Sequence, residues 1–107
     1  MANSKMIAFP PLDTKLDYYS DWTVRMQLKL EEKACYYAVE HDAPDTDDEE
    51  ILADFNTQNT KARAQIAKYL GPYALNIVKP HIASAKGMWD ALRAAYENKV
   101  LQIRQTY

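Results

Sequence analysis

The chain contains two glycines in 107 residues. Strand-rich folds need many tight turns, and glycine supplies the unusual backbone dihedrals that those turns require. Helices need glycine mainly at their ends. A sequence so poor in glycine therefore predicts an all-α fold.

Cysteine is also scarce, since Cys35 is the one cysteine of the chain. A single thiol excludes an intramolecular disulfide, supplies no cysteine set for structural zinc, and fits a reducing compartment. The N-terminal residues lack the long apolar segment of a signal peptide, and no apolar run approaches the length of a membrane span. We therefore expect a soluble, intracellular protein with no membrane partner.

The chain lacks an excess of positive charge, because 13 Lys and Arg residues face 15 Asp and Glu residues and the net charge is −2. A nucleic-acid-binding domain usually carries a basic face in marked excess. The adjacent pairs Tyr18-Tyr19 and Tyr36-Tyr37 could form a stacking platform for single-stranded nucleic acid. Without charge asymmetry we favour the other interpretation, in which the rings lie at the core margin and their hydroxyls reach water.

Residues that could carry chemistry are few. Cys35 with His41 or His81 would make a thiol–imidazole pair, but no glycine-rich turn accompanies them to form an oxyanion hole. The acidic run at residues 42–49 lacks the central glycine and the terminal glutamate of a calcium-binding EF-hand loop. We therefore expect a protein that is not an enzyme and that binds no cofactor or metal.

Two parts of the chain differ in character. Residues 1–17 contain Pro10-Pro11 and are predicted to form an extended N-terminal arm, because proline removes a donor and restricts the residue before it. Residues 18–107 are predicted to form one helical domain. Three apolar residues of the arm are candidates for the core: Ile7, Phe9 and Leu12.

The first predicted helix covers residues 20–33, with Ser20 as its N-cap. Trp22, Met26 and Leu30 recur at four-residue spacing and form one apolar stripe. A second stripe is formed by Val24, Leu28 and Cys35. Two stripes predict a helix that packs against more than one neighbour.

The most regular helical pattern covers residues 48–70 and follows an acidic loop at residues 41–50. Two pairs at its start have capping-box spacing: Thr46 with Glu49, and Asp47 with Glu50. Its inner face alternates steps of three and four residues, with Asn59 as a polar interruption: Leu52, Phe55, Asn59, Ala62, Ile66 and Tyr69. Gly71 is predicted to end this helix in a left-handed conformation.

Later helices are predicted from proline and serine signals. Pro72 can open a short helix that ends before Pro80, and Ser84 is the predicted N-cap of a helix that ends near residue 99. A last helix is predicted at residues 100–107. Because no helix-ending residue follows, we expect this chain to be the first part of a longer polypeptide.

The order of these features resembles the N-terminal part of the Gag protein of copia-type LTR retrotransposons. In that family a tyrosine and a tryptophan open a basic amphipathic helix, as Tyr18 and Trp22 do here. An acidic, proline-containing loop and a long helix follow. The next family helix has the form Ala-Lys-x-x-Trp-x-x-Leu-x-x-x-Tyr, which residues 85–96 match (AKGMWDALRAAY). The match spans nearly the whole chain from Leu12 onward.

This resemblance implies an all-α, capsid-like bundle of four or five helices after the extended arm. It implies that seven motif residues belong to the structural core: Trp22, Met26, Phe55, Ile66, Trp89, Leu92 and Tyr96. It also implies a structural module that associates with copies of itself into a shell, the surfaces of contact being unassigned. The family binds RNA through regions absent here, and its particles are cytoplasmic, with a nuclear location as the alternative.

A second function stays open at this point. A domesticated Gag fragment in a host protein could act as an adaptor that recognises a peptide or protein partner in a groove between helices. The frequent aromatic residues favour that interpretation, and they include Tyr73 beside the two tyrosine pairs.

Overall fold

The computed structural model describes the backbone of residues 9–106 and the side chains of residues 9–97. Five α-helices lie within this part of the chain: α1 (Tyr19–Glu32), α2 (Tyr37–Glu40), α3 (Glu49–Lys68), α4 (Pro72–Val78) and α5 (Ala85–Thr106). Two short 3-10 helices, Leu16–Tyr18 and Lys79–His81, precede α1 and follow α4. The prediction of an all-α fold is confirmed, since the described residues contain one isolated backbone bridge and no strand.

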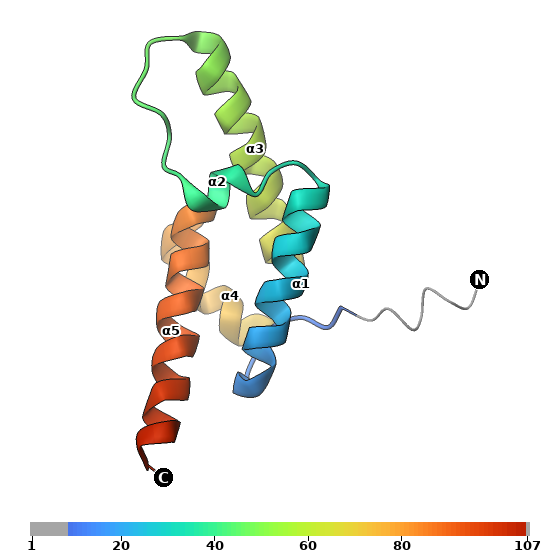
Figure 1. The fold of residues 1–107 in the computed structure, drawn as a ribbon, viewed down its shortest axis with the longest axis vertical. Coiled ribbons are helices and arrows are strands. Elements are labelled where there is room, and N and C mark those ends of the chain that lie inside the picture. Colours follow the sequence, from blue (N-terminus) through green and yellow to red (C-terminus); the bar gives the residue numbers. More distant parts are fainter. Residues whose placement is uncertain (1–8, 107) are drawn as a thin grey trace, which may run out of the picture.

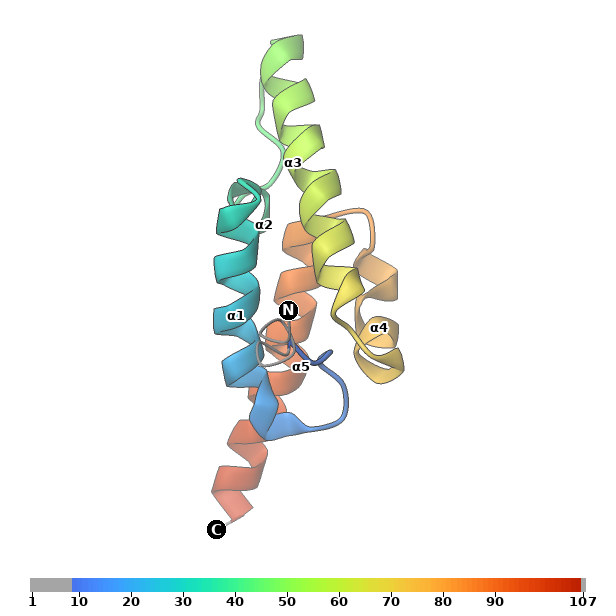
Figure 2. The ribbon, with the colours of Figure 1, turned by 90° about the vertical axis from the view of Figure 1, so that its right-hand side faces the viewer.

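Helices α1, α3 and α5 run along the length of the molecule, and α4 packs against α5 (Figure 1). The short helix α2 contacts both α3 and α5. Seen from the side, the first turns of α3 project beyond the bundle at one end, and the last turns of α5 extend past it at the other (Figure 2). The compact part of the molecule therefore comprises α1, α2, α4, the end of α3, and α5 as far as Tyr96.

Ring contacts join α1 to α5 in the centre of the core. Trp22 lies 5.9 Å from Trp89 between ring centroids, and Tyr19 stacks on Tyr96 at 5.2 Å. Trp22 is fully buried, and its indole N–H donates to the Tyr69 carbonyl at 3.0 Å. Since an indole N–H needs a partner when it is buried, this bond also fixes the end of α3 against α1.

The residues before α1 add a short extended segment to this core. Leu12 is fully buried, its N–H donates to the Tyr69 carbonyl at 2.8 Å, and its carbonyl accepts from the Gly71 N–H at 2.8 Å. These two bonds form the bridge between Leu12 and Leu70. Phe9 packs against the same cluster, whereas Ile7 lies outside the described residues.

Asp13 connects the start of α4 to the middle of α5. Its carboxylate accepts from the Tyr73 N–H at 2.8 Å, in the first turn of α4, where an anion is favoured by the unpaired amides. Its carbonyl accepts from the Tyr96 hydroxyl at 2.6 Å. A Cβ placed on Gly71 would lie 2.5 Å from the Asp13 carboxyl carbon, so this position has room only for glycine.

Asn59 explains the polar interruption in the stripe of α3. Its side-chain amide donates to the Ala83 carbonyl at 3.0 Å, and its oxygen accepts from the Ala85 N–H at 2.8 Å. Ser84 also caps α5, as predicted, by accepting from the Gly87 N–H at 3.1 Å. Two polar side chains from distant parts of the chain therefore set the start of α5.

Three predicted helix ends are wrong. Ser20 does not cap α1, because the 3-10 turn before it already supplies carbonyl partners to the first amides. Asp48, and neither predicted capping box, caps α3 by accepting from the Glu50 and Ile51 N–H groups at 2.9 and 3.3 Å. Gly71 has φ −82° and is extended, because it pairs with Leu12 instead of closing α3.

The number and limits of the helices also differ in detail from the prediction. Pro72 opens α4 as predicted. The last two predicted helices are one, since the backbone of α5 continues to Thr106, and Tyr107 lies outside the described residues. Helix α2 was not predicted, because four residues are too few to show a helical period.

Helix α1 ends in a Schellman motif. The Cys35 N–H donates to the Leu30 carbonyl at 2.9 Å, and the Ala34 N–H donates to the Glu31 carbonyl at 3.0 Å. Leu30 and Cys35 are both buried, which adds the apolar contact typical of this motif. Ala34 has φ 59°, a left-handed conformation that alanine adopts only with strain.

We expect Gly71→Ala to lower the free energy of unfolding by about 1–3 kcal/mol, because the new methyl group overlaps the Asp13 carboxyl group. Urea unfolding measures this loss. In an Asp13→Ala background the same substitution should cost less, since the two carboxyl atoms at 2.5 Å are gone and only the Cβ of residue 13, at 2.8 Å, still overlaps. Equal losses in both backgrounds would contradict this packing. Gly87→Ala is the control, because a Cβ there would make a tight contact at 3.3 Å with the His81 Cβ but would not overlap it.

Ala34→Gly should raise the free energy of unfolding by about 1 kcal/mol, because glycine adopts the left-handed conformation without strain. Ala34 is exposed, so no buried contact is lost. The control is Ala53→Gly inside α3, also exposed, which should lower stability by about 1 kcal/mol. A loss of stability in both variants would show that the helix end is not strained.

Candidate functional site

The cysteine and the two histidines considered for a thiol–imidazole pair each have a different environment. Cys35 is fully buried, and burial raises the pKa of its thiol, an effect that Lys61 and Lys33 offset only in part. His41 stacks on Tyr37 with 4.0 Å between ring centroids, and His81 is exposed in the turn after α4. A thiol held in its protonated form is a weak nucleophile, so this environment does not activate Cys35.

Within residues 9–97, no three His, Cys, Asp or Glu side chains lie close enough to hold a metal ion. In the acidic run, Asp48 serves as the cap of α3, and the carboxylates around it face solvent. Of the helices in the described part of the chain, none combines the length and the apolar character that spanning a bilayer requires.

The seven motif residues are all buried: Trp22, Met26, Phe55, Ile66, Trp89, Leu92 and Tyr96. Six of them belong to one contiguous cluster, whereas Phe55 is buried separately, farther along α3. The rings of Trp89 and Tyr96 thus face α1 from the inner side of α5. Tyr96 and most of the Trp89 ring form the interior of the domain.

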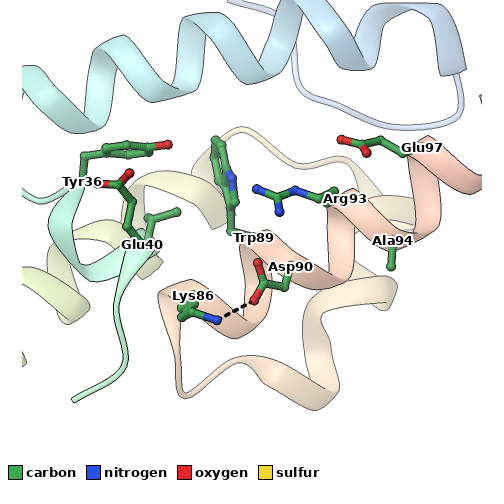
Figure 3. Close-up of a pocket in the computed structure, with 9 residues that line it drawn as sticks. Tyr36, Glu40, Lys86, Trp89, Asp90, Arg93, Ala94 and Glu97 are labelled. Carbon is green, nitrogen blue, oxygen red and sulfur yellow. Dashed lines mark hydrogen bonds and ion pairs between the residues drawn. The ribbon is translucent and has the colours of Figure 1, made fainter. Parts of the chain in front are cut away.

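A groove lies between α2 and the first half of α5 (Figure 3). It has a volume of about 600 Å³, and Tyr36, Val39 and Trp89 supply its apolar wall. The Tyr36 and Trp89 rings meet edge to face at 6.1 Å. Trp89 is 7% exposed, so its edge forms part of the groove wall while the rest of the ring lies in the core.

Charged groups of both signs surround the groove. Lys86 and Asp90 form an ion pair at 2.9 Å, and this bond, together with the charge of Asp90, raises the pKa of Lys86. The Arg93 guanidinium extends along the groove toward Trp89, with Glu97 beyond it, and Glu40 faces them from α2 (Figure 3). This arrangement suits a peptide with an apolar side chain and mixed charges better than a strongly charged polymer.

A second surface combines aromatic, apolar and basic side chains from three segments. We name it the basic aromatic patch, and its members are Phe9, Arg25, Leu28, Lys29, Lys68 and Tyr69. Phe9 stacks on Tyr69 with 4.2 Å between ring centroids and 13° between ring planes. The ammonium groups of Lys29 and Lys68 each lie 5.7 Å from the centre of the Tyr69 ring, a cation–π distance.

The second predicted stripe of α1 does not pack against a neighbour. Val24 is 58% exposed and Leu28 is 60% exposed, whereas Cys35 is buried beyond the helix end. Helix α1 does pack against more than one neighbour, as predicted, since it contacts α3 and its rings contact α5, but it does so without the Val24–Leu28 part of the second stripe. The physical reason is that α3 and α5 both lie on the side of Trp22 and Met26, which leaves the adjacent apolar stripe open.

No protein-family model, no curated protein and no solved structure matches this chain. The candidate surfaces therefore follow from the geometry alone.

Sequence reasoning proposed a groove between helices but did not place it, and it did not find the basic aromatic patch. Phe9, Leu28 and Tyr69 each lie in a different segment, so no spacing rule connects them. One signal was available: Arg25, Leu28 and Lys29 share a helical face on which apolar and basic residues alternate.

The buried tyrosines predict a loss of stability at alkaline pH. Burial, followed by the Glu97 carboxylate, raises the pKa of Tyr19 to about 12, although Arg93 opposes the shift. Burial is also the main cause of the raised pKa of Tyr96. In the unfolded chain the pKa of tyrosine is about 10. The contribution of these residues to stability is therefore complete below about pH 10 and is lost as the pH rises through the folded pKa.

The measurement is the urea midpoint from neutral pH to the alkaline range. We expect a fall above about pH 10 that is smaller in Tyr19→Phe than in the parent chain. Tyr37→Phe is the control, because Tyr37 is 51% exposed. An identical fall in the parent chain and Tyr19→Phe would show that the Tyr19 phenol is not responsible.

Proposed function

We propose that this chain is a structural self-assembly module, the N-terminal capsid-like part of a copia-type retrotransposon Gag or of a host protein descended from one. The order of its motifs and its all-α bundle support this proposal. Copies of the longer protein assemble into virus-like particles in the cytoplasm. These particles enclose RNA through regions outside this chain.

The observation that carries the proposal is the open apolar stripe of α1. Val24 and Leu28 lie one helical turn apart, and Leu28 adjoins the stacked rings of Phe9 and Tyr69. Single exposed apolar residues are ordinary on protein surfaces, but a contiguous group of this kind marks a contact surface. An assembling protein needs such a surface on the outside of a rigid core.

Assembly requires only weak contacts when each copy makes several of them. The rings of Trp22, Trp89 and Tyr96 keep the bundle rigid, so the contact surfaces stay in fixed relative positions. Many weak contacts between identical rigid units then add up to a stable closed structure. The two projecting ends of α3 and α5 give such a unit contact points far from its centre (Figure 2).

The alternative function is that of an adaptor with a peptide in the groove between α2 and α5. The groove favours this function, because Tyr36 and Trp89 are residue types that anchor bound peptides and Arg93 can orient them. A host could have put a domesticated Gag fragment to this use.

Sedimentation velocity over a wide concentration series tests the first function. We expect the weight-average sedimentation coefficient to rise with protein concentration, because weak apolar contacts populate only when copies are numerous. Leu28→Asp, which places a charge on the open stripe, should shift the rise to higher concentration by about tenfold. Ala94→Trp is the matched control, since it fills the α2–α5 groove and leaves the stripe unchanged.

A sedimentation coefficient that stays at the monomer value at every concentration would contradict self-assembly. The adaptor function would gain support if peptides selected by display then bound the chain and Ala94→Trp abolished their binding. RNA should bind weakly and with strong dependence on salt; tight binding that persists at high salt would contradict an indirect role for RNA.

A further inference from the structure

The basic aromatic patch has the features of a surface that receives a charged partner. Phe9 and Tyr69 form a stacked pair over a hollow of about 490 Å³, and Leu28 and Lys29 border it. Lys29 and Lys68 hold their ammonium groups on the Tyr69 ring at 5.7 Å each. These contacts hold two positive charges beside an exposed apolar surface.

The charges of the patch are only partly balanced within the molecule. Arg25 forms an ion pair with Asp21 at 3.1 Å, and Glu32 is the carboxylate that lines the hollow. Among residues 9–97, no carboxylate lies within ion-pair distance of Lys29 or Lys68. A partner that brings carboxylates to these two lysines would therefore be favoured.

The chain itself carries a segment with the complementary chemistry. Residues 41–50 contain six carboxylates and neither lysine nor arginine. All six side chains are exposed: Asp42, Asp45, Asp47, Asp48, Glu49 and Glu50. Ile51 follows them on α3 and is 48% exposed, so the segment pairs dense negative charge with an open apolar residue. The patch offers the same combination with the opposite charge.

A chain cannot easily bring this segment to its own patch. The acidic segment lies at the start of α3, which projects from the bundle, whereas Lys68 and Tyr69 lie at the end of the same helix (Figure 1). A helix of 20 residues separates the two ends by about 30 Å. Because α3 is one continuous helix, it holds the acidic segment and the basic aromatic patch apart, and each is open to another copy of the chain.

We propose that residues 41–51 of one copy dock on the basic aromatic patch of a second copy. Carboxylates of the segment face Lys29 and Lys68, and Ile51 packs near Leu28 and the Phe9–Tyr69 pair. The two surfaces differ, so the contact is head to tail and propagates from copy to copy into a ring or an open chain. This inference rests on the proposed self-assembly function and names the surfaces that carry it.

Charge reversal on each surface tests the contact. The patch variant combines Lys29→Glu with Lys68→Glu. The segment variant reverses the sign of residues 41–50, from −6 to +2, by four changes that spare the α3 cap: Asp42→Lys, Asp45→Lys, Asp47→Lys and Glu49→Lys. Each alone should weaken self-association about tenfold or more in sedimentation, because both surfaces then carry the same sign. An equimolar mixture of the two variants should restore association, since each surface again meets its opposite.

Two controls make the result specific. Lys15→Glu with Lys79→Glu changes the net charge as much as the patch variant does, at exposed lysines outside the patch, and should leave association unchanged. Thermal unfolding followed by circular dichroism checks that every variant is folded. Restoration in the mixture also excludes misfolding as the cause of the loss, because misfolded variants would not complement each other.

The outcomes that overturn the inference differ from those that overturn the function. If the parent chain associates and both reversal variants associate equally well, the docking contact is wrong and self-assembly stands. If the parent chain is monomeric at every concentration, both fail. If a single-stranded RNA oligonucleotide binds the parent chain, and the patch variant loses that binding while keeping its association, the patch is an RNA surface and the docking contact is wrong.

Discussion

The segment around Leu12 and Asp13 determines how the helices fit together. The peptide groups of Leu12 pair with Tyr69 and Gly71, and Asp13 binds the first turn of α4 through its carboxylate and α5 through its carbonyl. Each of these polar groups is next to buried apolar surface, where an unpaired donor or acceptor is unfavourable. The position of α4, and with it the turn that leads into α5, therefore depends on a stretch that is not helical.

Sequence patterns within a few residues correctly predicted the inner face of α1 and the starts of α4 and α5. The four-residue spacing of Trp22, Met26 and Leu30 placed α1 and its inner face, and Pro72 and Ser84 located the starts of α4 and α5. The left-handed conformation predicted for Gly71 was wrong because Gly71 pairs through its N–H with the carbonyl of a distant residue, Leu12, in an extended conformation. The rule that glycine ends a helix in the left-handed conformation failed here, because a tertiary contact determines the backbone conformation of Gly71.

Surfaces were harder to predict than the core. Helical periodicity shows that a residue is apolar and which residues share its face, but it does not show how many neighbours a helix has. Leu28 and Val24 were expected to be covered, and they are exposed because α1 has partners on one side only. The basic aromatic patch brings together three segments that no sequence spacing relates, so only the folded chain reveals it.

The bond between the Tyr96 hydroxyl and the Asp13 carbonyl joins residues that lie 83 positions apart. During synthesis the segment with Leu12 and Asp13 leaves the ribosome before α4 and α5 do. Its partners on α4 and α5 follow it, so the contacts of Asp13 with Tyr73 and Tyr96 form only after these helices have emerged. Until then Leu12 lacks part of the apolar cluster that buries it, and chains shortened before Tyr96 lack the hydroxyl that donates to the Asp13 carbonyl.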